Sequence, residues 1–288
     1  MTLFNISLAH WSFRRSTFDG DLNPLDIPKL ALDEFGIDAA EYVNRQFHKH
    51  FDDLEYVQEL KRRTDDLGVR NLVMMIDHEG KIGDPDEKAR PQAIENHVKY
   101  LEPVKELGCH SMRVNAHSDG SPEQQKHLLV DGLSRLTERA EPYGLNIIVE
   151  NHGLLSSDGE WLAGVIREVN HPNCGTLPDF GNFCLDWSRM DDPSVWRDRY
   201  QGVKAMMPFA KAVSAKSNDF DEHGNEMQTD YRRMLRIVLD AGYRGHIGIE
   251  YEGLELSDID GVRATQRLLE TVRDELRDEY EVTASAGS

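Results

Sequence analysis

The chain has 288 residues, of which 52 are Asp or Glu and 33 are Lys or Arg, and its formal net charge is −19. This acidic surplus argues against a nucleic acid or an anionic membrane surface as partner, because like charges repel. Hydrophobic residues make up 39% of the chain, which is enough to bury a core and excludes global disorder. The length suits two ordinary domains or one large α/β barrel.

The N-terminal segment and the cysteines indicate the cellular setting. No run of about 18 apolar residues occurs, and residues 1–11 lack the charged region and cleavage site of a secretory signal. We therefore expect a cytoplasmic protein without a membrane partner. Cys109, Cys174 and Cys184 form no C-x-x-C pair, so they predict neither a disulfide framework nor a thiolate zinc site.

One unit recurs along the chain: a short apolar run, a polar turn, and an amphipathic helical stretch that ends in glycine. The apolar runs are predicted as strands over residues 3–9, 37–43, 70–77, 111–116, 146–150, 175–178, 212–216 and 246–250. The glycines that close helical stretches are Gly36, Gly68, Gly108, Gly144 and Gly242.

Eight strand–helix units at a spacing of roughly 35 residues predict a single (β/α)8 TIM barrel. We assign residues 1–280 to this barrel and residues 281–288 to a disordered tail. A doubly wound open sheet is the alternative. It lacks support because no G-x-G-x-x-G motif follows the first predicted strand.

Carboxylates stand at the ends of three predicted strands, where a barrel places its chemistry. The fifth and eighth strands end in Glu150 and Glu250, and Asp179 follows the sixth. Burying three carboxylates together is costly unless a cation compensates them, and oxygen ligands favour Mn²⁺ or Mg²⁺. The alternative is a buried ion network in which Arg113 and Lys216 neutralise the two glutamates.

Other polar residues at the strand ends are candidates for substrate contacts. Trp11 offers an aromatic face on which a bound ring can stack, and Arg113 and Asn115 leave the same side of their strand because they are two residues apart. His152 either binds substrate hydroxyls or orients Glu150. The predicted substrate-binding residues are His10, Trp11, Glu41, Arg113, Asn115, His152 and Asn182.

The chain resembles the xylose isomerase-like barrels in four segments: IIVENHG (147–153), TLPDFGNF (176–183), AKSNDFDEHGNE (215–226) and GIEYEG (248–253). Within that superfamily it is similar to the sugar phosphate isomerases/epimerases, which include tagatose 3-epimerases and inosose dehydratases. The resemblance covers residues 3–276. It implies a metal held by Glu, Asp, His and Glu from strands five to eight, with the two glutamates on opposite faces of the substrate as acid and base.

The resemblance carries three metal ligands over to this chain: Glu150, Asp179 and Glu250. Ser214 stands where the pattern has the ligand His, and Asn182 stands where a second His is common. Two alternatives remain open. Either a water or a loop residue completes the metal shell, or the metal is weak or absent and Lys216 supplies the positive charge. The loop candidates are Asp219, Asp221 and His223.

The predicted function is a metal-assisted isomerase or epimerase of a free or phosphorylated keto-sugar. Glu150 and Glu250 form the acid/base pair for proton abstraction next to a carbonyl, and the metal or Lys216 is the electrophile. In the alternative reaction, the same enolate expels a hydroxyl or glycosyl group, which makes a dehydratase or lyase acting on an inosose or 3-keto-glycoside.

Two further functions belong to other classes. A non-catalytic sugar-binding barrel is consistent with the missing His. Repair of abasic DNA, found among distant members of the superfamily, is disfavoured by Ser214, Asn182 and the net charge of −19. The expected partner is therefore a small carbohydrate, and the assembly is left open between a homodimer and a homotetramer.

Overall fold

A computed structural model describes residues 2–47, 51 and 53–286, and these residues contain eight strands in one parallel sheet. The strands are β1 (Asn5–Ala9), β2 (Ala39–Val43), β3 (Arg70–Met75), β4 (Ser111–Val114), β5 (Asn146–Glu150), β6 (Cys174–Leu177), β7 (Val213–Ser217) and β8 (His246–Tyr251). All eight predicted strands are confirmed, with ends that differ by at most two residues.

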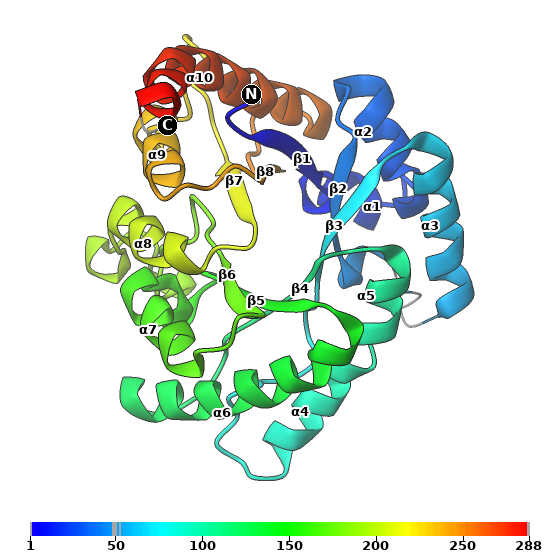
Figure 1. Ribbon diagram of the computed structural model, residues 1–288, viewed down its shortest axis with the longest axis vertical. Helices are drawn as coiled ribbons and strands as arrows, with labels where there is room; N and C mark the ends of the chain where they lie inside the picture. The colour runs from blue at the N-terminus through cyan, green and yellow to red at the C-terminus, as the bar shows by residue number, and fades with distance from the viewer. Residues whose placement is uncertain (1, 48–50, 52, 287–288) are drawn as a thin grey trace.

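The sheet runs in the order β6-β5-β4-β3-β2-β1-β8-β7 and curls round on itself (Figure 1). Two short bridges join β6 to β7, where Thr176 pairs with Ala210 and Asp179 pairs with Ser214. The Ser214 N–H donates to the Pro178 carbonyl at 2.9 Å. These contacts close the predicted (β/α)8 barrel and bring Asp179 directly against β7.

Helices surround the sheet on its outer side (Figure 1). Two of them end at Gly36 and Gly68, whose φ angles of 65° and 70° lie in the left-handed region, as the predicted glycine stop signals require. The α-helices of the described chain are α1 (Arg14–Phe18), α2 (Ile27–Phe35), α3 (Leu54–Leu67), α4 (Ala89–Val98), α5 (Leu101–Leu107), α6 (Pro122–Ala140), α7 (Gly159–Val169), α8 (Arg199–Met206), α9 (Tyr231–Asp240) and α10 (Asp258–Ala286).

Strand alternation decides which side chains face the inside of the barrel. On β5, Ile147 and Val149 belong to the large core between sheet and helices, whereas Ile148 belongs to a smaller cluster of its own. Glu150 lies two residues after Ile148 and therefore leaves the same, inner side of the strand. The same alternation directs Glu250 of β8 inward, since Ile247 and Ile249 belong to the large core. Both glutamates thus point into the mouth of the barrel.

The structure also bears on the chain's C-terminal end, its cysteines and membrane contact. Helix α10 extends to Ala286 and so enters the segment predicted as a disordered tail. Residues 287 and 288 lie outside the described residues, and the division at residue 280 stays a prediction.

Cys109, Cys174 and Cys184 are buried, free thiols. Among the described helices, none combines the length and the apolar composition needed to cross a membrane.

Candidate active site

Three buried carboxylates meet at the mouth of the barrel. Glu150 at the end of β5, Asp179 after β6 and Glu250 on β8 each place one oxygen within 4.8 Å of the others. Their exposed fractions are 2%, 0% and 4%. The structure therefore brings together the three residues that the sequence predicts as metal ligands.

Ser214 of β7 links two of these carboxylates. Its hydroxyl donates to Asp179 Oδ2 at 2.8 Å and lies 3.2 Å from Glu250 Oε2. The side chain thus faces the site at the position where the family resemblance implies a His. Among the described residues, the group of potential metal ligands contains the three carboxylates and none of the loop candidates Asp219, Asp221 and His223. The Asp221 carboxylate instead accepts backbone N–H groups of its own loop.

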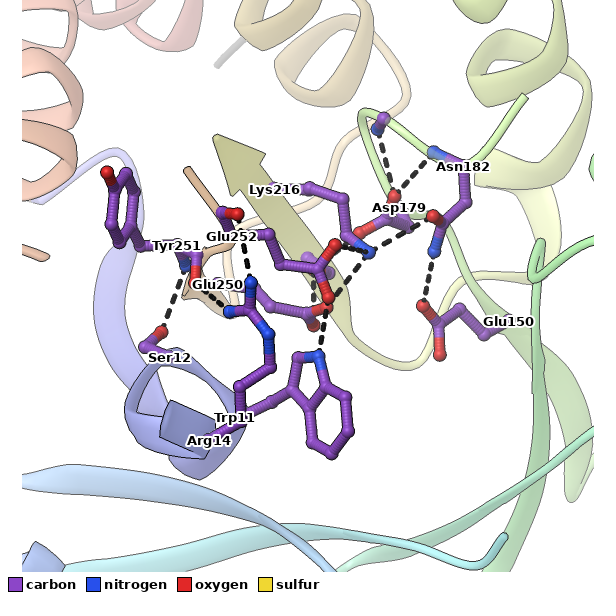
Figure 2. A network of polar contacts seen from close by, with 12 residues as sticks. Trp11, Ser12, Arg14, Glu150, Asp179, Asn182, Lys216, Glu250, Tyr251 and Glu252 are labelled. Atoms are coloured by element: carbon purple, nitrogen blue, oxygen red, sulfur yellow. Dashed lines mark hydrogen bonds and ion pairs between the residues drawn. The ribbon is translucent and has the colours of Figure 1, made fainter. Parts of the chain in front are cut away.

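Two cations reach the same cluster from β4 and β7. Lys216 Nζ lies 3.1 Å from Glu250 Oε1 and 3.0 Å from the Asn182 side-chain oxygen (Figure 2). Arg113 Nε lies 3.0 Å from Glu150 Oε2, and the Asn182 amide donates to Glu150 Oε1 at 2.9 Å. Both arrangements expected from the sequence therefore coexist: three carboxylates converge, and each glutamate also has a cationic neighbour.

Burial shifts these acids toward neutrality. Desolvation raises the pKa of Glu150 to about 7, although the Arg113 charge opposes the shift. Desolvation likewise raises the pKa of Asp179 to about 6, against the charge of Lys216. The pKa of Glu250 is also raised by burial, and Lys216 opposes that rise. A carboxyl group that titrates near neutral pH can both accept and return a proton, which is what acid/base catalysis requires.

The predicted substrate-binding residues divide into two sets. Trp11 lies at the mouth, where its indole N–H donates to Glu252 (Figure 2). Asn115 donates to Asp77 Oδ1 at 2.9 Å, beside Arg113. His152 is half-buried, and desolvation lowers its pKa to about 3, which keeps the imidazole neutral. These side chains lie around the carboxylates.

His10 and Glu41 lie deeper than expected. His10 is fully buried, and its ring packs edge-on against Phe47 with 5.0 Å between centroids. Glu41 occupies the middle of β2, accepts a hydrogen bond from the Ser7 hydroxyl of β1, and reaches over β1 to β8, because a Cβ on Gly248 would lie 2.6 Å from its Oε1. Burial raises the pKa of Glu41 to about 7. A substrate contact for either residue stays a prediction.

Two acidic residues that were not selected from the sequence join the site. Glu252 Oε2 lies 3.2 Å from Lys216 Nζ, and Asp77 Oδ1 lies 2.7 Å from Arg113 Nη1. The signal that could have found Glu252 is its spacing, because it stands two residues after Glu250. Asp77 likewise stands two residues after the last residue of β3.

Comparison with known proteins agrees with the barrel fold. Residues 30–273 match the family described as xylose isomerase-like TIM barrel. The chain belongs to that family. This xylose isomerase-like barrel is 34% identical over 91 residues to the C-glycoside deglycosidase alpha subunit of Arthrobacter globiformis, a match that covers 32% of this chain and 24% of that protein.

Two further similarities extend over most of the barrel. The 3′-dehydrocarminate deglycosidase alpha subunit of a Microbacterium species is 22% identical over an alignment of 283 positions, gaps included, and the match covers 75% of this chain and 78% of that protein. The solved structure of an L-ribulose 3-epimerase superposes with a TM-score of 0.72 at 12% identity, and the match covers 97% of this chain and 98% of that one. At this identity the superposition shows the fold alone. The xylose isomerase-like barrel thus has sequence relatives named as deglycosidases and a structural neighbour named as an epimerase.

Proposed function

We propose that this protein abstracts a proton next to the carbonyl of a keto-sugar, with Glu150 and Glu250 as the acid/base pair. The observation that carries the proposal is the convergence of two buried glutamates, from β5 and β8, on Asp179 within 4.8 Å. Burial raises the pKa of both glutamates, which suits proton transfer near neutral pH. Isomerases and epimerases of keto-sugars need this chemistry.

The donor set fits a divalent cation. Three carboxylate oxygens are the ligands that Mn²⁺ and Mg²⁺ prefer, and the buried Glu150 Oε2 accepts no hydrogen bond from the described residues. Glu150, Asp179 and Glu250 would hold the ion. When bound, it would supply a Lewis acid that polarises the substrate carbonyl. Lys216 is the protein's own positive charge beside the same carboxylates.

The chain's own residues would move the proton as follows. The ionised glutamate takes the proton from the carbon next to the carbonyl, and the electron pair of that C–H bond passes to the carbonyl oxygen as an enolate. The second glutamate, which is protonated at the start, gives its own proton to the same carbon from the other face, and this inverts the stereocentre. Asn182 fixes Glu150 by donating to Oε1, and Ser214 fixes Asp179 in the same way.

A lyase acting through the same enolate is the second candidate, because both sequence relatives are named as deglycosidase alpha subunits. The prefix 3′-dehydro in one of these names denotes a ketone at C3′ of the compound that is cleaved. In a 3-keto-glycoside, the enolate can expel the group on the next carbon instead of receiving a proton. The two candidates therefore share the base and differ in the fate of the enolate.

One experiment tests both candidates. The purified protein is incubated in D₂O with Mn²⁺ and with free ketoses, phosphorylated ketoses or aryl 3-keto-glucosides, and NMR follows the proton next to the carbonyl. We expect deuterium to replace this proton, with an epimer as product for the isomerase and a released phenol for the lyase. If no compound exchanges its proton and none is cleaved, while sugars still bind, the protein is a non-catalytic sugar-binding barrel.

Replacing Ser214 with His is expected to tighten Mn²⁺ binding about ten-fold, or about 1.4 kcal/mol, because it adds an imidazole ligand beside Asp179 and Glu250. Isothermal titration of Mn²⁺ into parent and Ser214→His measures the change. Ser214→Ala is the matched control, since it removes the hydroxyl without adding a ligand. Lower activity without any dependence on metal would instead favour Lys216 as the electrophile.

A further inference from the structure

Glu150 and Glu250, the inner carboxylates, each lie beside a cation that also contacts a second carboxylate. These second carboxylates, Asp77 and Glu252, are called the outer carboxylates. On one side Lys216 Nζ lies 3.1 Å from Glu250 and 3.2 Å from Glu252. On the other side Arg113 lies 3.0 Å from Glu150 through Nε and 2.7 Å from Asp77 through Nη1. The same three-part arrangement of inner carboxylate, cation and outer carboxylate therefore occurs twice around the barrel mouth.

The outer carboxylates are held from their far side. Glu252 accepts the Trp11 indole N–H, and its backbone carbonyl accepts Arg14 Nη2 at 2.9 Å (Figure 2). Asp77 accepts the Asn115 amide at 2.9 Å, and its own backbone N–H donates to Asn44 Oδ1 at 3.0 Å. Neighbouring strand ends thus fix both outer carboxylates, which gives each cation a stationary second partner.

The directions of the hydrogen bonds show which partner Arg113 favours. Nη1 donates to Asp77 at 2.7 Å. Nε lies 3.0 Å from Glu150 Oε2, yet neither atom makes a hydrogen bond. This contact is therefore an ion pair whose N–H bond does not point at the carboxylate oxygen. An aligned, bidentate contact would bind the glutamate more strongly. Asp77 therefore draws the guanidinium away from full pairing with Glu150.

We propose that Asp77 and Glu252 are positioning residues that keep Arg113 and Lys216 from pairing fully with Glu150 and Glu250, and so leave the inner carboxylates available to a divalent cation. The inference deepens the proposed function and rests on its metal site. Without Asp77, Arg113 has one carboxylate left to pair with and competes with the metal for it. Without Glu252, Lys216 competes in the same way for Glu250.

The test measures Mn²⁺ affinity without substrate, by the EPR signal of free Mn²⁺, in the near-isosteric variants Asp77→Asn and Glu252→Gln. We expect each variant to bind Mn²⁺ five- to ten-fold more weakly than the parent. The matched control is Glu79→Gln, which removes one negative charge from the same loop as Asp77. Glu79 lies 3.0 Å from Lys99, and the Lys99 ammonium lies over the Tyr100 ring, so this pair is separate from Arg113 and Lys216. Glu252→Asp restores the charge and is expected to recover most of the lost affinity.

Unchanged affinity in both variants would overturn the inference, and so would an equal loss in Glu79→Gln, because the effect would then be one of net charge alone. Failure of Glu252→Asp to recover affinity would also overturn it. Circular dichroism checks folding, and if Asp77→Asn does not fold, the Glu252 variants decide. A parent that binds no Mn²⁺ overturns the inference, whereas one that binds Mn²⁺ but exchanges no keto-sugar proton overturns only the proposed catalytic function.

Discussion

Replacing Glu150 or Glu250 with Gln is expected to lower turnover by about two to four orders of magnitude while the fold stays intact. Glutamine has nearly the same shape, but it cannot accept the substrate proton and is a weaker metal ligand. The fold should tolerate the change, because the Asn182 amide can still donate to the side-chain oxygen at position 150. Removing a buried charge also removes its desolvation cost.

Proton exchange in D₂O separates the roles of the two glutamates. The variant that lacks the base should lose exchange of the proton next to the carbonyl, whereas the variant that lacks the acid should retain exchange and lose inversion. Glu106→Gln on the exposed surface of α5 is the control and should keep full turnover. Near-normal turnover in either Glu150→Gln or Glu250→Gln would contradict the assignment of the acid/base pair.

The barrel could be predicted because its signals are local. Each strand is a short apolar run, and glycines such as Gly36 and Gly68 end the preceding helices in a left-handed conformation. These features repeat with the same order along the chain, so an error at one strand end changes little in the fold. Closure between β6 and β7 gave no such signal, because it depends on two isolated bridges rather than on a continuous ladder.

The inner carboxylates were also predictable, since their positions follow from strand alternation. Glu150 and Glu250 end runs in which alternate residues face the helices, so both point inward. Glu41 was grouped with the residues at the strand ends, although it stands two residues before Val43, where both the predicted strand and β2 end, so its carboxyl lies deeper in the barrel. A distance of two residues along a strand moves a side chain by one layer.

The sharing of cations could not be read from the sequence. Arg113 and Lys216 were each expected to pair with a glutamate. Spacing could place Glu252 and Asp77 near the mouth, but it does not indicate that each cation lies between two carboxylates. That outcome depends on side-chain conformations at the ends of five different strands, and on anchors such as the Trp11 indole. Long-range contacts of this kind have no spacing signature along the chain.

Replacing Lys216 with Met is expected to destabilise the metal-free protein by about 3–5 kcal/mol, because it leaves buried carboxylates without their cation. Lys216 is 5% exposed and lies close to both Glu250 and Glu252. Urea unfolding of parent and variant, in the presence of a chelator, measures the loss. Lys126→Met is the control, since the pair Lys126–Glu168 is also close, at 2.8 Å, but lies at the surface, and its loss should cost less than about 1 kcal/mol.

The pH dependence of this loss identifies its cause. Burial already raises the pKa of Glu250 above its unfolded value of 4.5, and removal of Lys216 raises it further. A carboxyl group whose pKa is higher in the folded state binds more protons there, so the stability it contributes falls as pH rises between the unfolded and folded values. The deficit of Lys216→Met should therefore be smaller at pH 5, where Glu250 can become neutral, than at pH 8. Mn²⁺ should then restore more stability to the variant than to the parent, because the ion replaces the missing charge. A deficit that is independent of both pH and Mn²⁺ would mean that Lys216 supports the fold by packing and does not neutralise the carboxylates.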